Sequence, residues 1–256
     1  MYNASKVSTS VPCTIPTDNH MTQIYFIDWP QSASPALRMA CADFTIAMFD
    51  SAAFHREGIE CPPQIARSVA KRQLEFLHGR RCARAAMALL LRGMPPQLGI
   101  GERRAPLWPS YVIGSISHTV GMAAAVALPA GMAHRGVGLD IENVLDAATA
   151  TAVRNMVATP AELDLLAPLE AELGADVALT LLFSAKESFF KATHDEIGYY
   201  FDFDAIALEW LDPAARRMDF SVRETLSAQW PRGSLSQVGF QFPTPALVAT
   251  LCLTPS

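Results

Sequence analysis

The stretch Gly138-Leu139-Asp140-Ile141-Glu142 decides the fold, and it predicts the end of a strand that covers residues 135–142. Apolar residues occupy every second position from Val137 to Ile141, as in a strand with one face in a core. With this period, Asp140 and Glu142 project together from the other face. Two carboxylates at a strand end form half of a site for a hard cation such as Mg²⁺, which keeps positions for water and phosphate oxygens.

A second stretch, Phe-Ser-Ala-Lys-Glu-Ser-Phe-Phe-Lys at 183–191, predicts a helix over 176–193 without Gly or Pro. Polar residues share one stripe of this apolar segment: Thr180, Ser184, Glu187, Ser188 and Lys191. Glu187 could supply a third metal ligand or a base, and Lys191, one turn on, a phosphate clamp. Lys186 lies about 100° round the helix from Glu187 among apolar residues, so its ammonium must reach solvent or meet an anion.

Each pattern alone has an ordinary structural explanation. An Asp-x-Glu sequence on a strand is most often a solvated face. A Glu–Lys pair at i,i+4 is most often a surface ion pair of little energetic weight. The argument for a site therefore depends on the combination of the two stretches.

Together the two stretches resemble the signature motifs of the 4'-phosphopantetheinyl transferases, and the closer likeness is to the monomeric, double-length branch that serves siderophore, peptide and polyketide synthetases. Two further blocks resemble that branch in order and spacing, Arg-Ala-Pro-Leu-Trp-Pro at 104–109 and Gly-Ser-Ile-Ser-His-Thr at 114–119. A weaker block is Phe-Leu-His-Gly-Arg-Arg-Cys-Ala-Arg at 76–84. The resemblance covers about residues 65–195.

The resemblance implies an α+β fold of two pseudo-symmetric halves, each a small antiparallel sheet packed on helices, with the active site at their interface. We expect an N-terminal half over 21–133 with the coenzyme A contacts and a C-terminal half over 134–256 with the metal and catalytic motifs. Residues 1–20, rich in Ser, Thr, Pro and Asn, predict a mobile tail. One long helix is expected from Pro62 to Gly93, and helices over 147–173. Strands are expected at 22–29, 39–49, 112–117, 122–128, 205–211, 218–223, 236–242 and 246–253.

The implied reaction moves 4'-phosphopantetheine from coenzyme A to a serine of an apo acyl-carrier or peptidyl-carrier protein and releases 3',5'-ADP. Mg²⁺, with Mn²⁺ as an alternative, would be the cofactor, and its expected ligands are Asp140, Glu142 and Glu187. The expected catalytic residues are Glu187, as the base, and Lys191, which stabilises the departing phosphate. The expected coenzyme A contacts are Arg80, Arg84, Arg104, Ser117, His118, Asp140, Lys186 and Lys191, with Ser117 and His118 at the nucleotide end near the 3'-phosphate.

Two other functions remain open. A Mg²⁺-dependent hydrolase of nucleotide pyrophosphates would need the same carboxylates and basic residues, but it would degrade coenzyme A with water alone. A non-catalytic module that binds carrier proteins is a weaker alternative, because the full Asp, Glu and Glu set is present. The sequence leaves open which carrier protein is served and whether acyl-coenzyme A is accepted.

The composition excludes several classes. The chain has 256 residues, half of them hydrophobic, and a net charge of −5, which argues against nucleic-acid binding. Five scattered cysteines without Cys-x-x-Cys spacing predict reduced thiols rather than a zinc site or disulfides. No segment has the ~18 apolar residues of a membrane span, and the N-terminus lacks the features of a signal peptide. We therefore expect a cytoplasmic protein, and the resemblance to the double-length branch implies a monomer.

Overall fold

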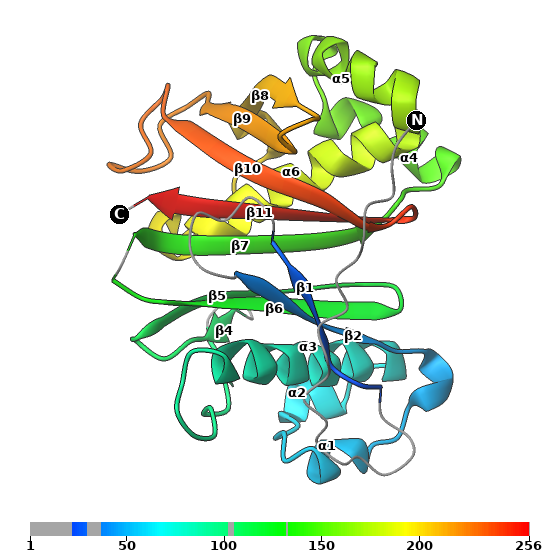
Figure 1. Ribbon diagram of the computed structural model, residues 1–256, viewed down its shortest axis with the longest axis vertical. Helices are drawn as coiled ribbons and strands as arrows, with labels where there is room; N and C mark the ends of the chain where they lie inside the picture. Colours follow the sequence, from blue (N-terminus) through cyan, green and yellow to red (C-terminus); the bar gives the residue numbers. More distant parts are fainter. Residues whose placement is uncertain (1–21, 30–36, 102–104, 132, 256) are drawn as a thin grey trace.

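The computed structural model describes residues 22–29, 37–101, 105–131 and 133–255. The predicted tail at 1–20 and the predicted coenzyme A contact Arg104 lie outside these residues. Figure 1 shows two sheets, one above the other, with strand β7 in the middle of the molecule.

The N-terminal sheet has four antiparallel strands in the order β1-β2-β6-β5. Its strands are β1 (Tyr25–Asp28), β2 (Arg38–Asp43), β5 (Val112–Thr119) and β6 (Met122–Pro129). Helix α3 (Ala70–Ala88) covers one face of this sheet (Figure 1). Small residues on β6, Ala123 and Ala125, let the helix approach closely, and they share a core with Leu74 and Met87 of α3.

The C-terminal sheet has five antiparallel strands in the order β7-β11-β10-β9-β8. Its strands are β7 (His134–Asn143), β8 (Ile206–Asp212), β9 (Arg217–Val222), β10 (Leu235–Thr244) and β11 (Leu247–Pro255). Helix α6 (Ala175–Ile197) packs on this sheet. Helix α5 (Pro160–Leu173) packs against α6 and β8, and α4 (Ala147–Val157) packs against α6. Helix α5 begins after Thr159, which caps it and forms a capping box with Glu162.

Short elements complete the described chain. They are η1 (Ile46–Met48), α1 (Ala53–Arg56), α2 (Pro63–Ala66), β3 (Gly99–Ile100), β4 (Pro106–Leu107) and η3 (Phe203–Ala205). The prediction of one helix from Pro62 to Gly93 is wrong, because α2 ends at Ala66 and α3 begins at Ala70. The amide of Gln73 donates to the carbonyls of Ala66 and Ser68 and so satisfies the end of α2.

A core between the two sheets joins the halves. Val137, Leu139 and Ile141, on one face of β7, pack with Met39 of β2 and Val126 of β6. The predicted α+β architecture of two antiparallel sheets packed on helices is therefore confirmed. The opposite face of β7, which carries Asp140 and Glu142, is covered by α6.

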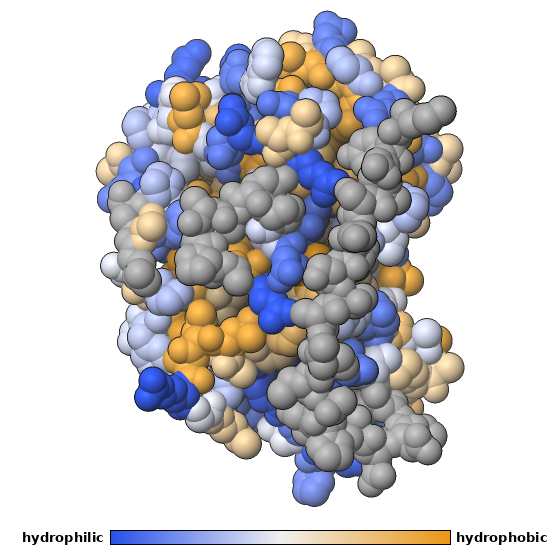
Figure 2. Space-filling view, viewed as in Figure 1, coloured by the Kyte–Doolittle hydropathy of each residue, from blue (hydrophilic) through white to orange (hydrophobic). Residues whose placement is uncertain are grey.

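The surface drawn in Figure 2 mixes hydrophilic and hydrophobic residues over both halves, as is usual for a folded chain. Among the described residues, no helix combines the length and the apolar character needed to cross a membrane.

Candidate active site

Two glycines on β7 bring α6 against the strand backbone. A Cβ atom at Gly138 would overlap the carbonyl oxygen of Ser188, and one at Gly136 would overlap that of Ala192. Because these glycines alternate with apolar residues, they lie on the same strand face as Asp140. The close contact between strand and helix sets the polar stripe of α6 beside the carboxylates of β7.

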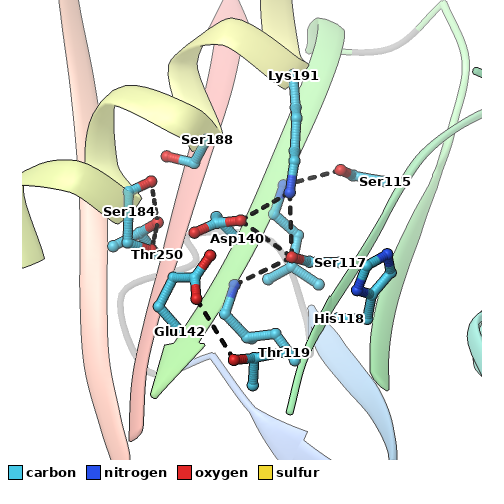
Figure 3. A network of polar contacts seen from close by, with 12 residues as sticks. Ser115, Ser117, His118, Thr119, Asp140, Glu142, Ser184, Ser188, Lys191 and Thr250 are labelled. Atoms are coloured by element: carbon cyan, nitrogen blue, oxygen red, sulfur yellow. Dashed lines mark hydrogen bonds and ion pairs between the residues drawn. The ribbon is translucent and has the colours of Figure 1, made fainter. Parts of the chain in front are cut away.

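Asp140, Lys191 and Ser117 form a compact polar group at this contact (Figure 3). The Lys191 ammonium lies 2.7 Å from Asp140 Oδ1 and donates to Ser117 Oγ at 3.0 Å. Ser117 Oγ in turn donates to Asp140 Oδ1 at 3.0 Å. Asp140 is 2% exposed, and its second oxygen, Oδ2, is buried and has no hydrogen-bond partner among the described residues. A buried carboxylate oxygen without a partner is costly unless a ligand completes it.

The other two predicted metal ligands carry raised pKa values. Burial raises the pKa of Glu142 to about 7, and the charge of Asp140 adds to the shift, whereas Lys191 opposes it. Burial also raises the pKa of Glu187, and Asp140 again contributes while Lys191 opposes. Among the residues that the structure describes, no group of three or more His, Cys, Asp or Glu side chains is placed so that it could hold a metal ion.

His118, the next residue along β5, lies in a polar cluster with α3. The Arg72 guanidinium lies 2.9 Å from His118 Nε2, and since a guanidinium can only donate, this nitrogen accepts. Glu75 accepts from Arg72 at 3.3 Å. Burial lowers the pKa of His118, with Glu75 opposing that shift and Arg72 reinforcing it. The charges of Lys191 and Asp140 also act on His118, so this cluster adjoins the acidic group.

The same cluster lines a pocket of about 320 Å³ between α2, α3 and β5. Its lining residues are Gln64, Ile65, Ser68, Arg72, Glu75, Phe76, Gly79, Arg80, Ile100, Pro106, Ile116 and His118. Arg80 stacks on Phe76 and donates to the carbonyl of Gly99. Burial lowers the pKa of Arg80 to about 10, and the nearby Arg72 adds to the shift. Two guanidiniums in one pocket favour an anionic ligand.

Arg84 does not belong to this lining. Its guanidinium donates to the backbone carbonyl of Glu57 and lies 2.9 Å from the Glu57 carboxylate. The same carboxylate also pairs with Arg81, so one negative charge is shared by two guanidiniums. The contact of Arg84 with coenzyme A stays a prediction.

The Lys186 ammonium contacts α5 rather than the acidic group. It lies 2.8 Å from Glu162 and donates to the carbonyls of Val157 and Phe203, and the two charged side chains are 2% and 1% exposed. Burial lowers the pKa of Lys186, and Glu162 opposes the shift. With three acceptors inside the protein, its ammonium has no proton left for a phosphate in this arrangement, which favours a structural role, and the coenzyme A contact of Lys186 stays a prediction.

Two features of the site escaped the sequence prediction. The first is Arg72, one of several basic residues on its helix. It shares a helix face with Phe76 and Arg80 at i, i+4 and i+8, and this spacing could have identified it as a site residue. The second feature is Thr119 of β5, whose hydroxyl accepts from the Asn143 N–H of β7 and donates to Glu142.

Comparisons with known proteins agree with this arrangement. Residues 61–128 match the family model of the 4'-phosphopantetheinyl transferase N-terminal domain, and residues 136–252 match that of the 4'-phosphopantetheinyl transferase superfamily. The chain is 40% identical to Enterobactin synthase component D of Escherichia coli O157:H7 over 148 residues, which cover 57% of this chain and 68% of that protein.

Two other relatives are named as 4'-phosphopantetheinyl transferases. The chain is 42% identical over 153 residues to 4'-phosphopantetheinyl transferase Svp of Streptomyces mobaraensis, covering 59% of each protein. It is also 42% identical over 129 residues to 4'-phosphopantetheinyl transferase Npt of Nocardia iowensis, covering 50% of this chain and 54% of that one. The two family models, the shared sequence and the two-sheet fold show that this chain belongs to the 4'-phosphopantetheinyl transferase superfamily, the enzymes that move the phosphopantetheine arm of coenzyme A onto carrier proteins.

Proposed function

We propose that this enzyme transfers 4'-phosphopantetheine from coenzyme A to a serine hydroxyl of an apo acyl-carrier or peptidyl-carrier protein, with Mg²⁺ as cofactor and 3',5'-ADP as product. The observation that carries the proposal is Asp140: in the described part of the chain its buried Oδ2 has no hydrogen-bond partner, while Oδ1 is bound by Lys191. The basic pocket that adjoins this carboxylate supports a phosphate-rich substrate.

The donor set fits a hard cation that shares its ligands with a substrate. Mg²⁺ usually binds one or two protein carboxylates and completes its shell with water and phosphate oxygens. Asp140 offers an unpartnered oxygen, and Glu142 and Glu187 have raised pKa values that a nearby cation would lower. We propose these three as ligands. Bound there, Mg²⁺ would neutralise the pyrophosphate charge and favour in-line attack.

The protein residues divide the remaining work. Glu187 carries a raised pKa, as suits a base that takes the proton of the carrier serine, directly or through a water. Among the described residues of α6, Lys191 is the cation nearest to Asp140. We assign it the role of stabilising the negative charge that develops on the leaving phosphate.

The pocket beside α3 is proposed to hold the nucleotide end of coenzyme A. Arg72 and Arg80 offer guanidinium donors for phosphate oxygens. His118 lies between this pocket and the acidic group, consistent with the predicted contact near the 3'-phosphate. Both parts of the site come from one chain, and we propose a monomer with its two halves divided near residue 133.

The test is to follow coenzyme A and 3',5'-ADP by chromatography, with and without an apo carrier protein and with and without Mg²⁺. Because one relative is named a component of enterobactin synthase, a carrier protein from a synthase of that kind is the first to try. We expect release of 3',5'-ADP only when both carrier and metal are present, and its loss in Glu187→Gln. Degradation of coenzyme A without any carrier would instead identify a pyrophosphate hydrolase.

A further inference from the structure

The two halves of the protein meet at two edge strands, β5 and β7. Three side-chain hydroxyls of β5 accept hydrogen bonds from backbone N–H groups of β7, in the place of the carbonyls that a paired strand would offer. Ser115 Oγ accepts from the Leu139 N–H at 3.0 Å, Ser117 Oγ from the Ile141 N–H at 3.2 Å, and Thr119 Oγ1 from the Asn143 N–H at 3.3 Å. Each pair is separated by 24 residues in the sequence, so the two strands run parallel in one fixed register.

Two of these hydroxyls also contact a carboxylate. Ser117 Oγ donates to Asp140 Oδ1 at 3.0 Å, and Thr119 Oγ1 donates to Glu142 Oε2 at 3.4 Å (Figure 3). In both cases the hydroxyl accepts the N–H of the residue that follows the carboxylate. Ser115 repeats the backbone contact, but the corresponding position on β7 is Gly138, which has no side chain.

The hydrogen-bonding capacity of Ser117 is fully used within the protein. A serine hydroxyl has one proton to donate and two lone pairs to accept. The proton goes to Asp140, and the lone pairs accept from the Ile141 N–H and the Lys191 ammonium. A phosphate oxygen needs a donor, and this hydroxyl has none left to offer.

We propose that Ser117 and Thr119 are positioning residues that orient Asp140 and Glu142 for the transfer reaction, and that Ser117 is not a ligand of a coenzyme A phosphate. The hydroxyls hold each carboxylate to the strand junction, so that the register of β5 on β7 determines where the carboxylate oxygens lie. The idea rests on the proposed function of this acidic site, and it replaces the nucleotide contact that the family resemblance implied for Ser117.

The experiment compares Ser117→Ala and Thr119→Val with Ser115→Ala, which removes the same kind of strand contact from a residue of similar burial, 5% exposed against 4% for Ser117. Thermal unfolding measures the structural cost, calorimetry measures the affinity for coenzyme A, and calorimetry with Mn²⁺ at saturating coenzyme A measures the affinity for metal. Steady-state kinetics with an apo carrier protein give kcat and KM.

We expect the melting temperature to fall by a similar amount in all three variants. Only Ser117→Ala and Thr119→Val should lower kcat and Mn²⁺ affinity tenfold or more, with the affinity for coenzyme A within threefold of wild type. Thr119→Ser, which restores the hydroxyl, should recover most of the loss caused by Thr119→Val.

Two results would overturn the proposal. Equal losses of kcat and Mn²⁺ affinity in Ser115→Ala would mean that the hydroxyls only join the strands. A tenfold loss of coenzyme A affinity in Ser117→Ala, with Mn²⁺ affinity unchanged, would make Ser117 a substrate ligand. Failure of the proposed function would look different: the wild-type enzyme would modify no carrier, while the Mn²⁺ measurement would still separate Ser117→Ala from Ser115→Ala.

Discussion

Replacing Lys186 by Met tests whether this motif lysine is structural or binds substrate. Its ammonium bridges α6 to α5 through Glu162, to the end of α4 through the carbonyl of Val157, and to η3 through the carbonyl of Phe203. Methionine fills a similar volume without the charge. The substitution would therefore leave the Glu162 carboxylate, 1% exposed, without its cation.

The expected cost follows from this burial. Removing one partner of a buried ion pair destabilises a protein by about 3–5 kcal/mol, because the other charge stays buried and uncompensated. For a chain of this size, each kcal/mol lowers the melting temperature by about 2–4 °C, so a drop of about 10 °C is expected. The double variant Lys186→Met/Glu162→Gln should recover part of it, because the amide oxygen can still accept from the Leu208 N–H.

The assay pairs thermal unfolding with the affinity for coenzyme A, measured by calorimetry at a temperature where the variant stays folded. Lys191→Met is the matched control on the same helix, since the Lys191 side chain is 27% exposed and faces Asp140. Lys186→Met should lose stability and keep its affinity for coenzyme A, whereas Lys191→Met should lose turnover with a smaller loss of stability. An unchanged melting temperature together with a tenfold weaker affinity in Lys186→Met would refute the reasoning.

Three further predictions concern other parts of the structure. Gly138→Ala should cost about 1–3 kcal/mol or more in a urea titration and abolish transfer, because the new Cβ would overlap the Ser188 carbonyl oxygen; full stability would show that α6 is not held by this contact. Arg72→Gln should raise KM for coenzyme A about tenfold, the effect of losing about 1.4 kcal/mol of binding, while kcat stays within about twofold; an unchanged KM would remove Arg72 from the substrate pocket. Burial lowers the pKa of His78 from 6.5 to about 4, and the Arg81 charge adds to the shift, so the unfolded chain binds the extra proton first. The free energy of unfolding should therefore be unaffected by His78 above pH 6.5 and should decrease as the pH falls toward 4. His78→Gln should weaken this dependence of the free energy of unfolding on pH, measured by urea titrations at stepped pH; an unchanged dependence would contradict the prediction.

The local pattern of the sequence was enough to predict the elements that carry the chemistry. Alternating apolar residues predicted β7, and the unbroken apolar segment with a polar stripe predicted α6. The same reasoning required Lys186 to reach solvent or meet an anion, and it meets Glu162. That partner could not be predicted, because Glu162 caps a different helix and reaches Lys186 only through the packing of α5 on α6.

Features that depend on the pairing of distant segments were missed for a similar reason. The hydroxyl contacts of Ser115, Ser117 and Thr119 exist because the edges of two separate sheets meet in a parallel register, and neither strand reveals its neighbour in its own residues. The break between α2 and α3 depends on the side chain of Gln73, and no Gly or Pro lies at 64–78 to mark it.

Intact-mass spectrometry of an apo carrier protein is the most direct test of the transferase account. The carrier is incubated with this enzyme and coenzyme A, with Mg²⁺ or with a chelator, and a carrier whose acceptor serine is replaced by Ala serves as the control. The account predicts that the wild-type carrier gains one phosphopantetheine arm only with metal, and that the serine-free carrier gains none. A carrier modified equally well in the chelator would contradict the metal-dependent mechanism, and modification of the serine-free carrier would contradict transfer to the serine hydroxyl.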